Sequence, residues 1–192
     1  MAMHNELWFP SVIWSSIIHS VDNSALKKFA YDKQKTDEGR ILSNHGGWQS
    51  NDIKPNEFLE IDKLIQTIDK EIAIIASQTG LKYPKLYNIW VNINTPGSYN
   101  NLHHHVDAIF SGVYYVDAST EQGNIQFERG DNAEYHIPQE MIEKVTYYTS
   151  SKATYAAKTG GLYIFPGWLK HNVESNKTNK DRISISFNYG AT

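Results

Sequence analysis

Apolar residues recur along the N-terminal part of the chain with the spacing of amphipathic helices. Between Asn56 and Gln78 they follow one another at steps of three and four residues, namely Ile61, Leu64, Ile65, Ile68, Ile72, Ile75 and Ala76. This spacing puts them on one side of a helix that starts near Pro55 and ends before Gly80. Ser20–Lys35 carries a shorter stripe of the same kind. The pattern predicts two helices, the longer of which lies against a sheet.

From Lys82 onward the pattern changes to short β-type runs separated by turn residues. The runs are Lys85–Asn94, Ile109–Asp117, Asn124–Glu128, Val145–Tyr148, Gly161–Pro166 and Ile183–Asn188. Pro96-Gly97 and Gly123-Asn124 are typical turn pairs between them. Short strands after grouped helices predict a mainly β fold with N-terminal helices, a sandwich or barrel buttressed by those helices. The first nineteen residues form an apolar lead-in that adds a strand or packs on a face.

A chain of 192 residues is expected to form one domain, with 1–81 as a helical support region and 82–192 as the β core. The formal net charge is −3 and no Lys/Arg run stands out, so nucleic acid is not an expected partner. No stretch approaches the ~20 apolar residues of a membrane span, and the N-terminus lacks a secretion signal pattern. We therefore expect a cytoplasmic protein that acts on a small molecule or a peptide.

The chain has no cysteine and eight histidines, so any metal must be bound by His and carboxylate ligands. His105 and Asp107 are two residues apart, which on a strand would place both side chains on one face, about 6.6 Å apart. His171 follows the expected strand Gly161–Pro166 and is the natural third ligand. Two His and one carboxylate are the ligand set of non-haem iron(II) oxygenases. The motif H-x-D by itself is weak, because two such residues often meet by chance.

A second ligand set uses the neighbouring histidines. His103 shares the face of His105, so His103, His105 and His171 could form an all-histidine site of the cupin kind. His104 should face away from both. The residues leave the choice between Asp107 and His103 open.

The last expected strand has one apolar and one polar face. Ile183, Ile185 and Phe187 make the apolar face, and Arg182, Ser184, Ser186 and Asn188 make the polar one. A guanidinium pairs bidentately with a carboxylate, and a serine hydroxyl two residues along can donate to the same group. Arg182 and Ser184 therefore suit the distal carboxylate of 2-oxoglutarate, although an ordinary surface strand would show the same alternation.

Further candidates lie on the other strands. By strand parity Tyr115 falls on the side of Asp107, so its hydroxyl could reach the same carboxylate. Asn92 is a polar residue in an apolar strand and needs a partner if it is buried. Weaker candidates for lining an outer substrate pocket are Trp90, Tyr99, Tyr135, Trp168 and Asn172.

Four segments resemble a family of 2-oxoglutarate–iron(II) oxygenases, many of whose members come from marine bacteria and their phages. They read WVNINTPGSYNNLHHHVDAIFSGVYYV, GNIQFERG, GGLYIFPGWLKHNV and DRISISFN, and SNHGGWQS is similar to the family's N-terminal signature. The similarity runs from about Trp8 to Asn188. The wider superfamily's order of H-x-D, a distant His and then R-x-S is matched by His105, Asp107, His171, Arg182 and Ser184. In this family the second His of H-x-H is often followed by proline and a small or polar residue, where this chain has Val106 and Asp107.

The resemblance implies a double-stranded β-helix, a jelly-roll of the cupin type. It also implies Fe(II), 2-oxoglutarate and O2 as cofactor and co-substrates, with hydroxylation of an amino-acid side chain or a small metabolite. Two rivals stay open: a cupin-like enzyme that does not use 2-oxoglutarate, and a β-helix binding module without turnover. A homodimer could share the apolar lead-in.

Overall fold

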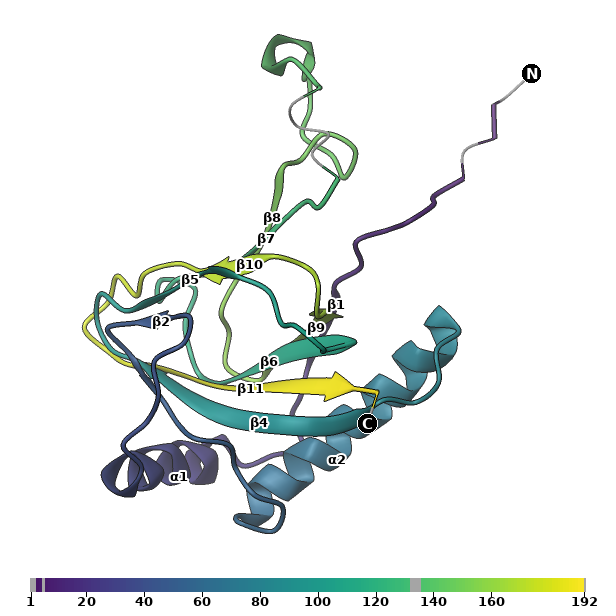
Figure 1. The fold of residues 1–192 in the computed structure, drawn as a ribbon. Helices are drawn as coiled ribbons and strands as arrows, with labels where there is room; N and C mark the ends of the chain where they lie inside the picture. The colour runs from purple at the N-terminus through teal and green to yellow at the C-terminus, as the bar shows by residue number, and fades with distance from the viewer. Residues whose placement is uncertain (1–2, 5, 132–135, 192) are drawn as a thin grey trace.

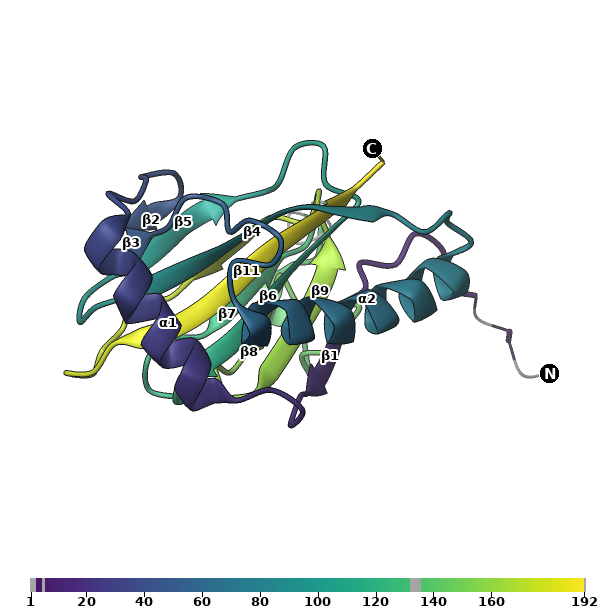
Figure 2. The same cartoon turned by 90° about the horizontal axis from the view of Figure 1, so that it is seen from below.

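Two antiparallel sheets face each other, and two helices cover the outer face of the larger sheet (Figures 1 and 2). The structure, a computed structural model, describes residues 3–4, 6–131 and 136–191. The helices are α1 (Asn23–Thr36), α2 (Leu59–Thr79) and a short 3-10 helix, η2 (Gln139–Met141). This is the mainly β architecture with supporting helices that the residue pattern predicted.

The larger sheet has six strands in the described residues. In order across the sheet they are β1 (Trp14–Ile17), β9 (Gly161–Pro166), β6 (Phe110–Asp117), β11 (Arg182–Gly190), β4 (Lys85–Asn94) and β3 (Trp48–Gln49). The smaller sheet contains β2 (Asn44–His45), β5 (Tyr99–His103), β10 (His171–Val173), β7 (Ile125–Glu128) and β8 (Lys152–Tyr155). The lead-in thus adds an edge strand, β1, which pairs with β9.

One expected strand is wrong. Val145–Tyr148 is not a strand, and Thr146 begins a turn closed by the Thr149 amide, which donates to the Thr146 carbonyl at 3.1 Å. The partner of β7 is instead β8, with Glu128 opposite Lys152. The residue pattern did not predict a strand at Lys152–Tyr155, and its pairing with β7 forms one there. Figure 1 shows that the described residues between β7 and β8, 129–131 and 136–151, project beyond the two sheets.

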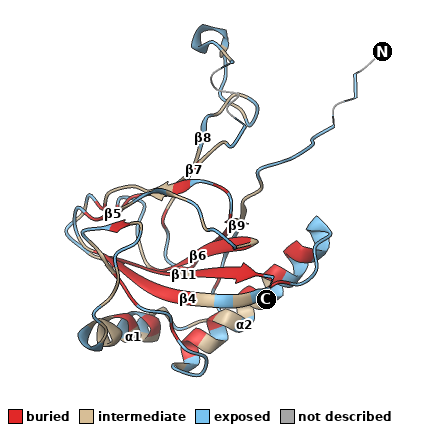
Figure 3. Ribbon diagram, viewed as in Figure 1, coloured by how far each residue is buried: buried red, intermediate tan, exposed pale blue. Residues whose placement is uncertain are grey.

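The main core lies between the helices and the larger sheet. Alternate residues of the long strands, such as Val91 on β4 and Ile185 on β11, point to α2 and are at most 1% exposed. The predicted apolar stripe of α2 packs against them, and its residues Leu64, Ile68 and Ile72 are at most 1% exposed. Figure 3 shows this burial on the strands and on the inner side of α2. The opposite faces of the same strands point toward the smaller sheet.

Between the two sheets the interior is only partly apolar. Its apolar cluster contains Val113, Tyr115, Ile125, Phe127, Ala157, Tyr163, Phe165 and Leu169. The inner face of β4 and β11 is polar, and Asn92, Asn94, Arg182, Ser184 and Asn188 are buried there. Polar side chains are buried when they have hydrogen-bond partners or when they serve a ligand. The polar inner face therefore marks the site.

Candidate functional site

Three histidines of the smaller sheet come together between the sheets. His103 ends β5 and His171 begins β10, and the two are opposite each other in the antiparallel register. His105 lies two residues after His103. One ring nitrogen from each of the three lies within 4.8 Å of the others. The Nε2 atoms of His105 and His171 are 3.4 Å apart, so the three rings can hold one metal ion.

Backbone carbonyls fix the ring orientation of two of these histidines. The Nδ1 of His103 lies 2.7 Å from the carbonyl oxygen of Asn101, and the Nδ1 of His171 lies 2.9 Å from that of Leu169. Because a carbonyl can only accept, each Nδ1 carries the proton and donates it. The neutral ring then has an unprotonated Nε2, which is the form that binds a metal.

Burial keeps these rings neutral. Loss of solvation, reinforced by the neighbouring His103 and His104, lowers the pKa of His105 to about 4. The pKa of His171 is lowered well below its usual value for the same first reason, and that of His103 is also lowered. At neutral pH all three imidazoles are therefore available as ligands without first losing a proton.

Asp107 lies outside this group. Strand β5 ends at His103, and Val106 and Asp107 form a turn in which Asp107 is exposed and has a φ of 68°. The amide of His105 donates to the carbonyl of Gly167 at 2.9 Å, which holds the chain in place as it leaves the strand. The two-residue parity expected for His105 and Asp107 needs a continuing strand. Of the expected ligands the structure thus brings His105 and His171 together, with His103 beside them.

A cavity of about 580 Å³ joins the histidines to the polar face of the larger sheet. Its described lining includes the three clustered histidines, the exposed His104 and two arginines, Arg40 and Arg182, but no aspartate or glutamate. An ion and an anionic ligand in this cavity would therefore meet no competing carboxylate.

Arg182 is buried at 1% exposure on β11. Its Nη1 donates to the backbone carbonyls of Gln122, Gly123 and Glu174. Gly123, with a φ of 89°, makes this approach possible, because a Cβ there would lie 2.8 Å from Nη1 and 2.3 Å from the Glu174 carbonyl oxygen. The guanidinium is thus held rigidly from one side.

The other side of that guanidinium has no partner in the part of the chain that the structure describes. There, Arg182 Nη2 and the hydroxyl of Tyr115 are both buried without a hydrogen bond. Burial raises the pKa of Tyr115 to about 12, so the hydroxyl stays protonated. Ser184 lies opposite Tyr115 on one neighbouring strand and opposite Asn92 on the other. Buried donors without an acceptor are rare and costly, and a carboxylate would satisfy both.

Asn92 lines the cavity but already has partners. Its Oδ1 accepts from Trp90 Nε1 at 3.2 Å, and its Nδ2 donates to Ser186 Oγ at 3.0 Å. The side chain therefore orients Trp90 and Ser186. Trp90 faces the cavity because residues 88, 90, 92 and 94 alternate inward on β4, and Ser186 does so by the same alternation of residues 182, 184, 186 and 188 on β11.

Of the expected substrate residues, only Trp90 lines the cavity. Tyr99 stacks on His45 with ring centroids 4.8 Å apart, and Trp168 is 53% exposed. Asn172 alternates with His171 on β10 and so points to the other face. Tyr135 lies outside the described residues. Sequence reasoning missed Arg40 and Asn88, and it named Asn188 only as part of the polar face of the last strand. The inward alternation of polar residues on β4 and β11 was the signal for the two asparagines.

The fold and the site define a class of protein, the jelly-roll metalloproteins that hold an ion between two sheets. Within that class, residues 88–188 match the family model described as "Putative 2OG-Fe(II) oxygenase". The match spans more than half of the 192 residues, and the chain belongs to the 2OG-Fe(II) oxygenase family. No curated protein matches the chain.

Solved structures share the whole fold. A prolyl-4-hydroxylase from Pseudomonas putida is 12% identical with a TM-score of 0.68, covering 95% of this chain and 94% of its own. A prolyl hydroxylase from Trichoplax adhaerens, bound to a hypoxia inducible factor peptide, is 11% identical with a TM-score of 0.66 and coverages of 93% and 83%. HygX from Streptomyces hygroscopicus, with nickel and 2-oxoglutarate bound, is 13% identical with a TM-score of 0.61 and coverages of 95% and 84%. The chain therefore has the double-stranded β-helix fold.

Among the described residues, no helix is long and apolar enough to cross a membrane. The expected cytoplasmic location stays a prediction.

Proposed function

We propose that this oxygenase holds its iron with His103, His105 and His171 and binds 2-oxoglutarate through Arg182, Ser184 and Tyr115. The observation that carries the proposal is the pair of buried donors without a partner, Arg182 Nη2 and Tyr115 Oη, in the cavity that the histidines also line. A bidentate carboxylate is the acceptor that a guanidinium fork fits best.

His103 takes the place expected for Asp107 in this proposal. The three imidazoles are neutral and lie within 4.8 Å of one another, whereas Asp107 is exposed in the turn beyond them. Three imidazoles would hold Fe(II) and would leave room for 2-oxoglutarate and O2 to reach the ion. The residues present therefore fit Fe(II) with 2-oxoglutarate. The site would also hold a more positive ion than one with a carboxylate ligand, which favours the dianionic co-substrate.

When bound, Fe(II) and 2-oxoglutarate supply the oxidation: O2 is used to convert 2-oxoglutarate to succinate and CO2 and to hydroxylate a C–H bond of the substrate. The chain's part is to position the reactants. The carbonyls of Asn101 and Leu169 orient two of the rings, and the carbonyls around Arg182 fix its fork before the co-substrate arrives. Such preorganisation removes an orientation cost from the reaction.

The proposed substrate is an amino-acid side chain, free or in a peptide, or a small metabolite. The cavity beyond the histidines carries hydrogen-bonding side chains such as Asn88, Ser186 and Asn188. Ser111 donates to Asn188, which in turn donates to Asn88, so this end of the cavity is polar and ordered. Two proteins of similar fold are prolyl hydroxylases, one with a bound peptide.

The first experiment is an anaerobic titration of the protein with Fe(II) and 2-oxoglutarate. Its readout is the weak visible charge-transfer band of a chelated 2-oxo acid. The wild type should show the band, Arg182→Gln should need far more 2-oxoglutarate, and His103→Ala should lose both iron and band. Asp107→Ala is the matched comparison and should keep the band. If Asp107→Ala loses it and His103→Ala keeps it, Asp107 is the third ligand instead.

The same titration separates the rival functions. Iron binding without a band, in a protein whose Arg182→Gln variant behaves like the wild type, would favour a cupin-like enzyme that does not use 2-oxoglutarate. Absence of iron binding would favour a binding module. With a band established, free amino acids and proline-containing peptides can be screened for O2-dependent succinate formation.

We also propose that two copies associate through the N-terminal lead-in. Leu7, Trp8 and Phe9 precede β1 and are 64%, 73% and 95% exposed. Neighbouring apolar side chains of this size are usually covered by a partner. Analytical ultracentrifugation should show a dimer that dissociates when Trp8 and Phe9 are both replaced by serine. A monomer in the wild type would contradict the proposal.

A further inference from the structure

Arg40 is a second cation on the wall of the cavity, separate from Arg182. Its guanidinium lies over the ring of Trp90, 5.7 Å from the ring centroid. The Trp90 ring is in turn 6.0 Å from the ring of His105. Arg40 is therefore two side-chain contacts away from the metal ligands and faces the same space.

The hydrogen bonds of Arg40 are incomplete. Its Nη2 donates to the carboxylate of Asp52 at 2.5 Å, in a pair whose side chains are 27% and 48% exposed. Its Nε is buried and has no partner among the described residues. A half-exposed ion pair of this kind is weak, and it uses only one part of the guanidinium fork. The unused Nε points to a missing acceptor.

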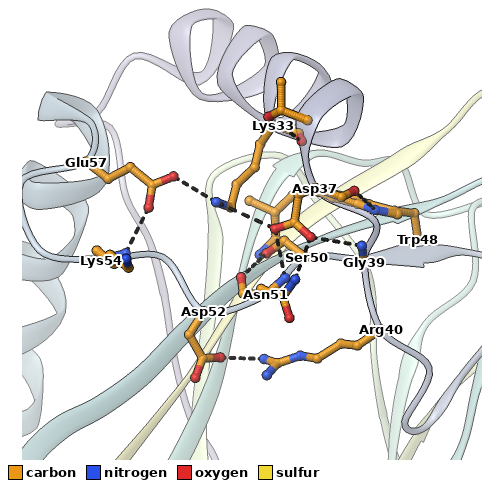
Figure 4. Close-up of polar contacts among 12 residues, drawn as sticks. Lys33, Asp37, Gly39, Arg40, Trp48, Ser50, Asn51, Asp52, Lys54 and Glu57 are labelled. Atoms are coloured by element: carbon orange, nitrogen blue, oxygen red, sulfur yellow. Dashed lines mark hydrogen bonds and ion pairs between the residues drawn. The ribbon is translucent and has the colours of Figure 1, made fainter.

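A network around Asp37 holds Arg40 in place (Figure 4). The Asp37 carboxylate accepts from the amides of Gly39 and Asn51 at 2.8 and 3.0 Å. The Asp37 carbonyl accepts from Trp48 Nε1 at 3.1 Å, and the Arg40 amide donates to the Gln49 carbonyl at 2.8 Å. The backbone that carries Arg40 is thus fixed to β3 before any ligand binds.

Glycine is required within this network. Gly39 has a φ of 75°, and a Cβ there would lie 2.5 Å from Trp48 Nε1. The chain therefore passes close over Trp48, and the next side chain, Arg40, is directed toward Trp90. A fixed cation loses little conformational entropy when it binds an anion.

The two arginines occupy different places along β4. Arg182 is opposite Asn94, and Arg40 lies over Trp90, four residues earlier, which is about 13 Å along a strand. Of the two arginines, only Arg182 is used by the distal carboxylate of 2-oxoglutarate in the proposed function. The one carboxylate on Arg40, that of the half-exposed Asp52, lies outside the described lining of the cavity, so the cavity side of Arg40 is open to a second anion.

We propose that Arg40 determines substrate specificity by binding a carboxylate of the substrate, which lies across Trp90 with its reacting carbon toward the histidines. This inference rests on the proposed function and sharpens it. The substrate is a small molecule with a free carboxylate, such as an amino acid, rather than an internal residue of a protein. Arg40 holds the substrate in position and takes no part in the oxidation.

The test follows the Nε–H signal of Arg40 by NMR in protein loaded with diamagnetic Zn(II) and saturated with 2-oxoglutarate. The signal is assigned by its loss in Arg40→Gln. N-acetylglycine and its uncharged analogue N-acetylglycinamide are then titrated separately. The carboxylate should shift the signal saturably and bind at least about tenfold more tightly than the amide, as expected for a charge-assisted hydrogen bond.

Asp52→Asn is the matched variant, because it removes the other carboxylate on Arg40. It should tighten N-acetylglycine binding several-fold, while Arg40→Lys, which keeps the charge but loses the fork, should weaken it. If Arg40 served only to hold Asp52, Asp52→Asn would not tighten binding. Equal shifts with the acid and the amide, or no shift with either, would overturn the inference.

The charge-transfer band of the Fe(II) and 2-oxoglutarate complex tells the two proposals apart. Arg40→Gln should keep this band, because Arg182 still holds the co-substrate. A normal band together with an unresponsive Arg40 signal refutes the role of Arg40 and leaves the oxygenase assignment standing. If the wild type shows no band at all, the co-substrate assignment itself is refuted.

Discussion

At the scale of single residues, the side chains around the cavity differ in whether their hydrogen bonds are complete. Asn92 and Ser111 have their partners within the protein, whereas Arg182 Nη2, Tyr115 Oη and Arg40 Nε have none among the described residues. A buried donor without a partner costs roughly 1–3 kcal/mol. These three unpaired donors therefore lower the stability of the free protein, and a bound ligand that accepts their hydrogen bonds restores it.

Tyr115→Phe should separate stability from binding. Removing a hydroxyl that has no partner should leave the free energy of unfolding unchanged or raise it by up to about 1 kcal/mol. The same change should weaken 2-oxoglutarate binding about tenfold, because a donor to its carboxylate is lost. Urea unfolding of the metal-free protein and titration of the charge-transfer band measure the two effects.

Tyr163→Phe is the control for that prediction. The Tyr163 hydroxyl donates to the Ala156 carbonyl at 2.9 Å, so its removal should lower stability by about 1 kcal/mol and leave 2-oxoglutarate binding near its original value. Equal destabilisation by both changes would mean that the Tyr115 hydroxyl has a partner in solution.

The buried histidines should make the metal-free protein sensitive to acid. The pKa of His105 in the folded protein, about 4, lies below the value of about 6.5 in an unfolded chain. The unfolded state therefore takes up protons first as the pH falls. The contribution of the neutral histidines to the free energy of unfolding should be fully present above about pH 6.5. It should decline toward pH 4, by up to about 1.4 kcal/mol per pH unit for each such histidine.

Urea unfolding between pH 7.5 and 4.5 after chelator treatment measures this decline. His105→Asn should flatten the profile, whereas substitution of the exposed His104 by glutamine should leave its slope nearly unchanged. A wild-type stability that does not change over this range would contradict the buried, neutral state of the rings.

At the scale of elements, the larger sheet separates two tasks. Its outer face packs on α1 and α2 through alternate apolar residues, and its inner face presents Asn92, Arg182 and Ser184 to the cavity. The helices lie on the face of the larger sheet that points away from the smaller sheet (Figures 1 and 2). Helix packing should therefore set stability while leaving the chemistry of the folded site intact.

Ile68→Ala tests this separation. Ile68 lies on the inner side of α2 and is 1% exposed. Its truncation should lower the free energy of unfolding by roughly 2–5 kcal/mol. Ile74, on the outer side of the same helix, is 53% exposed, so Ile74→Ala should change stability by less than about 0.5 kcal/mol. Below their unfolding temperatures both variants should bind 2-oxoglutarate like the wild type, and a weakened affinity in Ile68→Ala would show that the helix also shapes the cavity.

At the scale of the whole molecule, the site lies between two sheets that are also joined by the apolar cluster around Phe127 and Phe165. The three histidines come from the smaller sheet, and Arg182 and Tyr115 come from the larger one. A metal together with 2-oxoglutarate would bind both sheets at once. Ligand binding and folding stability should consequently be linked.

Zn(II) with 2-oxoglutarate should raise the melting temperature. At ligand concentrations about 100 times the dissociation constant, stabilisation is about 2.7 kcal/mol, or roughly 5–10 °C for a chain of this size. Differential scanning fluorimetry measures the shift, which a chelator should reverse. His171→Ala should show no shift, and a rise of the same size in that variant would place the metal elsewhere.

Local patterns in the sequence were enough to predict much of the fold and part of the site. The spacing of Leu64, Ile68 and Ile72 specifies one buried side of a helix, and the alternation from Arg182 to Asn188 specifies a strand with one polar face. Both patterns depend only on the period of the backbone, which neighbouring residues reveal. Parity placed Tyr115 on the side of Asp107, and from there its hydroxyl was expected to reach the carboxylate bound by Arg182. The structure leaves Asp107 in an exposed turn but does bring the unpaired donors of Tyr115 and Arg182 into one cavity among the described residues.

Long-range pairing decided the rest. Our proposal of His103 rather than Asp107 as the third ligand depends on β5 ending at His103 and on the His105 amide, which donates to the carbonyl of Gly167, more than sixty positions away along the printed sequence. Arg40 reaches the cavity only because the chain before β3 folds over Trp48, and β8 replaces Val145–Tyr148 because of its pairing with β7. The sequence by itself determined the periods of the elements and the residue types available for chemistry. Only the tertiary structure decided where strands stop and which distant side chains meet, because those outcomes depend on hydrogen bonds between segments far apart in the chain.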